Sequence, residues 1–232
     1  MLFRYLPLLR EDPILFGVLM GVTVVALVVA LTVHEFSHAL VATSLGDRTA
    51  QRQGRLSLNP LAHLDPIGTL LLFLVGFGWG KPVPVNPLAF GQRAFQGMAV
   101  VAGAGPLSNI LCAAAAALPF RTGFLDFPRW GVLYPTTGEA LVALVLGFIV
   151  IYNIFLAAFN LLPFFPLDGS RVVLGLVPER WAEVLVRLEP WGPGVLLVLL
   201  LVDSLLGLGL FSRLLGPVVN GLAGVLVGVR VL

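Results

Sequence analysis

The chain has 232 residues, of which 58% are hydrophobic and only 11% are charged. A soluble domain usually carries about 25% charged residues, so this composition excludes an ordinary water-soluble globule and indicates a polytopic membrane protein. The formal net charge of +2 comes from few ionisable groups and does not point to nucleic acid. We therefore expect an all-α membrane protein whose surroundings are the lipid bilayer and whose partners include no nucleic acid.

The N-terminal part of the chain contains one long apolar run and a more irregular segment. Ile14–Val33 has no charge and is long enough to cross the roughly 30 Å hydrocarbon core of a bilayer. The run continues as His34–Leu45, which carries three ionisable side chains. Pro66–Phe77 is apolar but too short to span, which predicts a re-entrant segment. Three prolines in Gly80–Pro87 favour extended backbone, so a short extended or β-hairpin segment is expected near residues 47–94.

The remainder of the chain predicts further spanning helices and one surface helix. The candidate spans are Gln96–Phe120, Ala140–Leu162, Val195–Phe211 and Leu214–Leu232, and the amphipathic surface segment is Val172–Leu188. Together these segments predict five to six transmembrane or re-entrant helices. We expect one domain over residues 1–232, with a catalytic core at 14–170 and C-terminal helices at 191–232.

The ionisable residues inside the first apolar run form an H-E-x-x-H motif, His34-Glu35-Phe36-Ser37-His38. Positions i and i+4 share one face of a helix, so His34 and His38 can bind one zinc ion together. Glu35 lies beside them and can accept a proton from a water that the zinc activates. With three His and six Glu in the chain, composition alone produces this pattern roughly 0.001 times per chain of this length.

The alternative interpretation is a pair of histidines that merely form hydrogen bonds inside a helix bundle. That interpretation leaves three polar groups in need of partners within an apolar helix, where they are costly. By helix rise, His38 and His34 lie roughly 12 and 18 Å from the helix end at Gly46. The motif therefore predicts a zinc ion within the membrane slab, away from its midplane.

A catalytic zinc site needs three protein ligands and one open position, so a third ligand must come from elsewhere in the chain. Four side chains are candidates: His63, Asp65, Asp168 and Asp203. Asp168 follows a spanning helix after two prolines, and irregular backbone at membrane depth is tolerated where it lines a cavity. Asp203 is mid-helix and His63 and Asp65 are in a polar stretch, where a hydrogen-bonding or capping role is an equal alternative.

Two motifs in order resemble the site-2 protease family of intramembrane zinc metalloproteases. They are H-E-F-S-H at residues 34–38 and N-L-L-P-F-F-P-L-D-G at residues 160–169. The segments 64–70, 80–87 and 104–109 (AGPLSN) are also similar to compact prokaryotic members without PDZ or CBS domains, so the resemblance covers roughly residues 14–170.

This resemblance implies specific roles for site residues. It implies His34, His38 and Asp168 as ligands of one zinc ion, and Glu35 as the general base. It also implies that Asn160 holds the substrate carbonyl or its oxyanion. Independently of the family, Asn160 lies eight residues before Asp168 and is an amide donor, but a helix–helix hydrogen bond explains it equally well. Asn109 and Asn153 are interpreted as mainly structural.

The distribution of basic residues predicts the orientation of the protein in the cell membrane. His34–His38 and Asp168 can meet only if the ends of their helices face the same side. That side receives nine basic residues: Arg48, Arg52, Arg55, Lys81, Arg93, Arg171, Arg180, Arg187 and Arg230. The opposite side receives five: Arg4, Arg10, Arg121, Arg129 and Arg213. The excess favours a cytoplasmic active-site end and an N-terminus outside, in the plasma membrane.

The function predicted is hydrolysis of a peptide bond in or near a transmembrane segment of a membrane protein, as in regulated intramembrane proteolysis. A zinc transporter or channel would use the same ligands but usually shows internal repeats, and a non-cleaving scaffold would close its zinc site with a fourth protein ligand. The sequence does not identify the substrate, the gating mechanism, the oligomeric state or the role of the last two helices.

Overall fold

The computed structural model describes residues 2–75, 78–128 and 135–229. The described part contains helices and connecting segments without a named strand. Its α-helices are α1 (Leu2–Glu11), α2 (Pro13–Ser44), α3 (Thr49–Arg52), α4 (Pro66–Val75), α5 (Ala94–Arg121), α6 (Gly138–Asn160), α7 (Asp168–Leu176), α8 (Glu179–Val186), α9 (Gly192–Leu206) and α10 (Leu210–Val227). Three 3-10 helices, η1 (Pro60–Ala62), η2 (Pro87–Arg93) and η3 (Glu189–Trp191), complete the described set.

Five described segments are long and apolar enough to cross a membrane: α2, η2 with α5, α6, α8 through α9, and α10. This confirms the prediction of an all-α polytopic membrane protein. Two boundaries differ from the sequence prediction because Gly207 and Gly209 adopt left-handed backbone conformations. They end α9 at Leu206 and begin α10 at Leu210, so Phe211 belongs to the second helix.

Helix α2 carries the H-E-x-x-H motif and has clear signals at both ends. The Asp12 carboxylate accepts a hydrogen bond from Leu15 N at 2.9 Å, and Pro13 occupies the first helical position, where a proline is well tolerated. Its 32 residues correspond to about 48 Å. Beyond its end, the Asp47 carboxylate accepts from Thr49 N at 2.9 Å and Asn86 N at 2.7 Å. Burial favours the neutral form of Asp47, but hydrogen bonds from the Thr49 hydroxyl, Asn86 N and Thr49 N, together with the charge of Arg52, outweigh burial and lower the pKa of the carboxyl.

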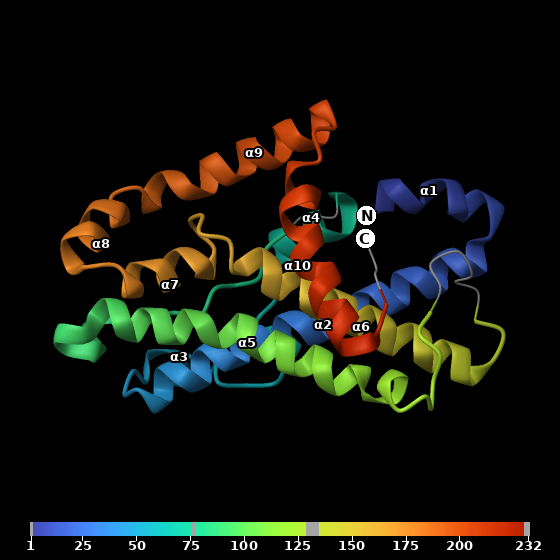
Figure 1. Cartoon of the computed structure of the whole chain (residues 1–232), viewed down its shortest axis with the longest axis horizontal. Helices are drawn as coiled ribbons and strands as arrows, with labels where there is room; N and C mark the ends of the chain where they lie inside the picture. The colour runs from blue at the N-terminus through green and yellow to red at the C-terminus, as the bar shows by residue number, and fades with distance from the viewer. Residues whose placement is uncertain (1, 76–77, 129–134, 230–232) are drawn as a thin grey trace.

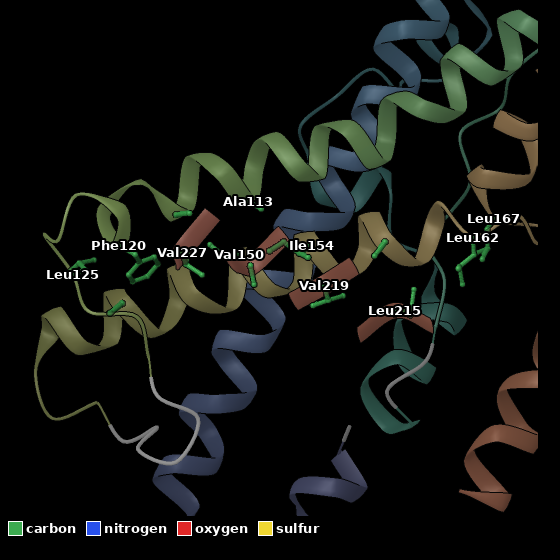
Figure 2. Packing of buried hydrophobic residues seen from close by; sticks show 14 of the residues in the cluster. Ala113, Phe120, Leu125, Val150, Ile154, Leu162, Leu167, Leu215, Val219 and Val227 are labelled. Atoms are coloured by element: carbon green, nitrogen blue, oxygen red, sulfur yellow. The ribbon is translucent and has the colours of Figure 1, made fainter. Parts of the chain in front are cut away.

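Helices α2, α5 and α6 pack against one another and form the centre of the molecule (Figure 1). Small side chains allow the close approach, as in many membrane helix pairs. The main apolar cluster lies between α5, α6 and α10, as Figure 2 shows. It includes Ala113 and Phe120 of α5, Val150 and Ile154 of α6, and Val219 of α10. A second cluster joins α2 to the N-terminal half of α6.

The C-terminal helices differ in how closely they pack. Helix α10 lies against α6 and α5, whereas α9 runs along the upper side of the view, away from the central bundle (Figure 1). Many leucine and valine side chains of α9 are exposed, which suits a lipid environment. The Asp203 carboxylate accepts hydrogen bonds from Leu210 N at 2.7 Å and Phe211 N at 3.3 Å. Asp203 therefore caps α10.

The predicted β-hairpin near residues 47–94 is wrong. The described part of this segment contains α3, η1, α4 and η2, and its only β-pairing is an isolated antiparallel bridge between Leu64 and Gly80. The extended stretch after Gly80 contains Pro82 and Pro84, which have no backbone N–H to donate to a ladder, and Pro87 begins η2.

Instead of a second strand, a buried side chain holds the extended stretch in place. The Arg55 guanidinium is buried and donates to the carbonyl oxygens of Ala62 and Lys81, joining the loop before α4 to the extended stretch after it. Lys81 N also donates to His63 O at 2.8 Å.

The amphipathic segment predicted at Val172–Leu188 forms two helices rather than one. Helix α7 ends at Leu176 and α8 begins at Glu179, with Val177 and Pro178 between them. The residue before a proline is driven away from the helical region, and Val177 has the extended ψ of 155° that this effect produces. Because α7 packs against α5, the break leaves the start of α7 anchored beside the central bundle.

Candidate metal centre

Three side chains from two distant parts of the chain meet at the centre of the bundle. His34 and His38 lie one turn apart on α2, and Asp168 is the first residue of α7. The Asp168 Oδ2 atom lies 3.1 Å from His34 Nε2 and 3.3 Å from His38 Nε2. The two Nε2 atoms are 3.1 Å apart. Among the described residues this is the cluster that could hold a metal ion.

The Nδ1 atom of each imidazole lies at hydrogen-bonding distance from an acceptor, so the Nε2 atoms of the two rings point toward one another. His34 Nδ1 lies 2.7 Å from Asn109 Oδ1, and His38 Nδ1 lies 2.8 Å from Val101 O. Both acceptors belong to α5. Each acceptor requires a proton on Nδ1, which leaves Nε2 as the nitrogen with a free lone pair.

The geometry of this cluster fits a zinc ion. Zinc holds His nitrogen and carboxylate oxygen at about 2.0–2.1 Å in a tetrahedral arrangement, which places ligand atoms about 3.3 Å apart. The three distances of 3.1, 3.1 and 3.3 Å match that spacing. Asp168 Oδ2 is buried and has no hydrogen-bonding partner of acceptable direction, as expected of an atom that faces a cation.

Gly105 of α5 has no side chain, and this leaves room for the two histidine rings beside it. A Cβ atom on Gly105 would lie 2.5 Å from His38 Nε2 and 2.6 Å from His34 Cε1, closer than real Cβ atoms approach. Helix α5 therefore passes the cluster at a distance that only glycine permits.

The Asp168 side chain is available as an anion. Burial favours its neutral form, but in the absence of a metal the imidazoles of His34 and His38, when they are protonated on Nε2 as well as Nδ1, can donate to the carboxylate and place positive charge beside it, which outweighs burial. They hold the pKa of the Asp168 carboxyl well below its usual range. Metal binding requires deprotonated ligands, and a carboxylate supplies the negative charge that offsets the cost of a cation in apolar surroundings.

Glu35 lies next to His34 on α2 and is partly exposed. Within the described residues it forms no hydrogen bond or ion pair, so its carboxylate is free to accept a proton. Burial lowers the pKa of the Arg55 guanidinium, and the negative charge of Glu35 partly offsets that effect. Arg55 thus places a positive charge within electrostatic reach of Glu35.

The structure gives the other candidate residues hydrogen-bonding partners of their own. Asn160 is the last residue of α6, and its Nδ2 donates to Leu156 O at 3.0 Å. His63 is fully buried, with Nε2 2.7 Å from Ser57 O. Asp65 accepts from Gly68 N at 2.7 Å at the start of α4, and Asp203 caps α10. His63, Asp65 and Asp203 therefore have local structural partners.

The sequence did not predict that Asn109 is the hydrogen-bonding partner of His34, or that Gly105 leaves room for the two histidine rings. The AGPLSN segment contains both residues, so the signal was present in a motif whose role was not assigned. The local sequence around Arg55 predicts only that this residue is one of the basic residues that set orientation, because nothing in it shows that Arg55 becomes buried.

Fold and site together define a polytopic membrane metalloprotein with a His-His-Asp centre beside a glutamate. Comparison with protein families matches residues 132–199 to "Peptidase family M50". The chain is 39% identical over 208 residues to YwhC of Bacillus subtilis (strain 168), with 87% of each chain covered. It is 30% identical over 179 residues to Rip2 of Mycolicibacterium smegmatis, covering 76% of this chain and 65% of the relative. Rip2 of Mycobacterium tuberculosis is 27% identical over 199 residues, covering 84% of this chain and 73% of the relative.

All three relatives carry the name "Putative zinc metalloprotease". The chain belongs to peptidase family M50, the site-2 protease family, and is a zinc metalloprotease. This confirms the resemblance drawn from the two sequence motifs. No solved structure gives a significant match to the chain.

Proposed function

We propose that this protein is an intramembrane zinc metalloprotease that hydrolyses a peptide bond in or near a transmembrane segment of a membrane-protein substrate, as in regulated intramembrane proteolysis. The observation that carries the proposal is the triangle of His34, His38 and Asp168 beside Glu35, held by helices long enough to cross a membrane. The proposal treats residues 1–232 as one domain with its catalytic core at 14–170.

In this proposal His34, His38 and Asp168 hold the zinc ion. When bound, zinc polarises a carbonyl and lowers the pKa of water toward about 7. Glu35 takes a proton from the attacking water as its oxygen bonds to the carbonyl carbon. As the C–N bond breaks, Glu35 passes that proton to the departing amine nitrogen, which balances the hydrolysis.

Asn160 is proposed to stabilise the developing oxyanion. Its Nδ2 carries two hydrogens, and the one bond to Leu156 O at 3.0 Å uses only one of them. The second N–H remains for a substrate oxygen, the role that amide donors fill in oxyanion holes.

An apolar cavity of about 100 Å³ supports the proposal that the substrate segment is hydrophobic. It lies between α2, the Gly78–Gly80 stretch and α6, and its lining includes Leu31 and Leu156. Leu31 is one helical turn before His34, and Leu156 is one turn before Asn160. Such a lining favours the apolar side chains of a transmembrane segment over those of a polar peptide.

The proposal is tested with purified protein reconstituted in lipid nanodiscs together with a panel of single-span reporter proteins tagged at both ends. We expect zinc-dependent cleavage inside or next to the span of at least one reporter, and its loss when a chelator removes zinc. A matched soluble reporter that carries only the polar flanking sequences should remain intact. Cleavage of the soluble reporter alone would contradict the intramembrane assignment.

The same preparation discriminates the rival functions. A transporter would move zinc across liposomes that contain the protein, and a scaffold would bind zinc without cleaving any reporter. Zinc flux without cleavage, or zinc binding without either activity across the reporter panel, would overturn the protease mechanism.

We also propose that the active-site end of the protein faces the cytoplasm and that the protein resides in the plasma membrane, because the assignment made from the sequence gives that side more basic residues than the other. Arg48 and Arg121 are both exposed. In this proposal Arg48, shortly after the end of α2, is on the active-site side, and Arg121, the last residue of α5, is on the opposite side. In a Cys112→Ala background, Arg121→Cys should react with a membrane-impermeant maleimide in intact cells, and Arg48→Cys should react only after lysis. Labelling of position 48 in intact cells would reverse the orientation.

A further inference from the structure

Two buried asparagines connect the metal cluster to all three central helices. Asn109 of α5 and Asn153 of α6 are each 0% exposed. Asn109 Oδ1 lies 2.7 Å from His34 Nδ1, while its Nδ2 donates to Ala30 O at 2.9 Å and to Asn153 Oδ1 at 2.7 Å. Asn153 Nδ2 donates to Ile149 O at 2.8 Å. The amides therefore form a continuous chain of hydrogen bonds from α6 through α5 to α2.

The direction of this chain follows from its two backbone ends. A carbonyl oxygen only accepts, so Ile149 O requires the NH₂ group of Asn153, and the Asn153 oxygen must face Asn109. Likewise, Ala30 O requires the NH₂ group of Asn109, so the Asn109 oxygen must face His34. An amide oxygen cannot donate, and His34 Nδ1 must therefore carry the proton.

The proton on Nδ1 determines the state of Nε2, the other nitrogen of the His34 ring. A neutral imidazole with its proton on Nδ1 has a free lone pair on Nε2, and His34 Nε2 is the atom 3.1 Å from Asp168 Oδ2. His38 reaches the same state through Val101 O. Whereas His38 relies on a backbone carbonyl, His34 relies on a side chain that a single substitution removes.

We propose that Asn109, itself oriented by Asn153, is a positioning residue that sets the tautomer of His34 and aims its Nε2 at the metal. This inference rests on the proposed zinc site. A purely structural role, in which the two amides only join helices, predicts a loss of stability without a specific effect on zinc binding.

The first test measures zinc affinity of the purified protein by competition with a chelator of known affinity. Asn109→Leu keeps the approximate volume but removes the acceptor, and we expect zinc binding to weaken by about 10- to 100-fold. Asn153→Leu should weaken it less. Asn109→Asp keeps an acceptor oxygen for the Nδ1–H of His34, so it should recover most of the affinity.

Thr23→Val is the matched control, because Thr23 is a buried polar residue of α2 at 1% exposure with a hydroxyl that has no partner in the described structure. It should leave zinc affinity unchanged. Thermal unfolding of the zinc-free proteins separates positioning from folding. A folded Asn109→Leu protein that binds zinc as tightly as the wild type overturns the inference, while the proposed zinc site itself stands.

The second test needs no variant of Asn109 and decides the question if Asn109→Leu fails to fold. The chain has three histidines, so ¹⁵N-histidine labelling gives a simple NMR spectrum, with His63→Gln for assignment. We expect a proton on Nδ1 of His34, with or without zinc, since Asn109 is present in both states. A neutral His34 ring in the zinc-free protein that carries its proton on Nε2 instead of Nδ1 overturns the inference. Failure of the wild type to bind zinc instead rejects the proposed function.

Discussion

Glu35→Gln is expected to abolish peptide-bond cleavage while leaving the zinc content of the protein unchanged. Gln matches Glu in size but cannot accept a proton from water, and the Glu35 carboxylate is not one of the three groups that meet at the metal cluster. General-base catalysis contributes roughly 10²- to 10⁴-fold to a rate, so cleavage of the single-span reporter should fall by at least that range. Metal analysis of the purified variant should still give one zinc per chain.

Glu139→Gln is the matched control for this experiment. Glu139 is exposed in the first turn of α6, outside the metal cluster, and the same chemical change there should alter neither cleavage nor zinc content. Normal cleavage by Glu35→Gln would refute the general-base role. Loss of zinc in that variant would show instead that Glu35 contributes to the metal site.

Gly105→Ala is expected to weaken zinc binding by more than tenfold and to reduce reporter cleavage accordingly. The added Cβ would lie 2.5 Å from His38 Nε2, one of the atoms that face Asp168. Helix α5 cannot move away freely, because Val101 O and Asn109 Oδ1 of the same helix hold the outer nitrogens of His38 and His34. The histidines must therefore shift, and the Nε2 atoms lose their spacing.

Gly103→Ala tests whether this effect belongs to the site rather than to the helix. Gly103 lies two residues earlier on α5, and an added Cβ meets no atom within 4 Å. Because Ala favours helix by about 1 kcal/mol over Gly, this variant should bind zinc and cleave as the wild type does, with equal or higher thermal stability. Equal zinc affinity in the Gly103→Ala and Gly105→Ala proteins would contradict the close-packing argument.

Features that depend on neighbours along the chain could be predicted from the sequence alone. Apolar runs predicted spanning helices because hydropathy and helix length are local properties, and each long run corresponds to a described helix. His34 and His38 share a face because the helical repeat places positions i and i+4 together. Asp168 is one of four candidate third ligands by the residues alone, and the resemblance of motifs singles it out, since no local rule indicates that a residue 130 positions after His38 would approach it.

The β-hairpin prediction shows where local reasoning failed. Prolines correctly indicated extended backbone in Gly80–Pro87, but an extended stretch becomes a hairpin only if a partner strand pairs along it. The preceding segment forms α4 instead, and a buried side chain, Arg55, holds the extended stretch. Burial of one cation beside two carbonyls is a property of the folded chain that its sequence neighbours do not reveal.

Only the tertiary structure decided how the metal cluster is supported. His34 and Asn109 are separated by 75 residues, and Asn109 and Asn153 by 44, yet all three lie in one hydrogen-bonded chain. A buried asparagine in a membrane helix has many possible partners, and packing of α2, α5 and α6 selects among them. Thus the sequence identified the residues whose side chains meet in the metal cluster, whereas helix packing determined which way those side chains point and left room for them at Gly105.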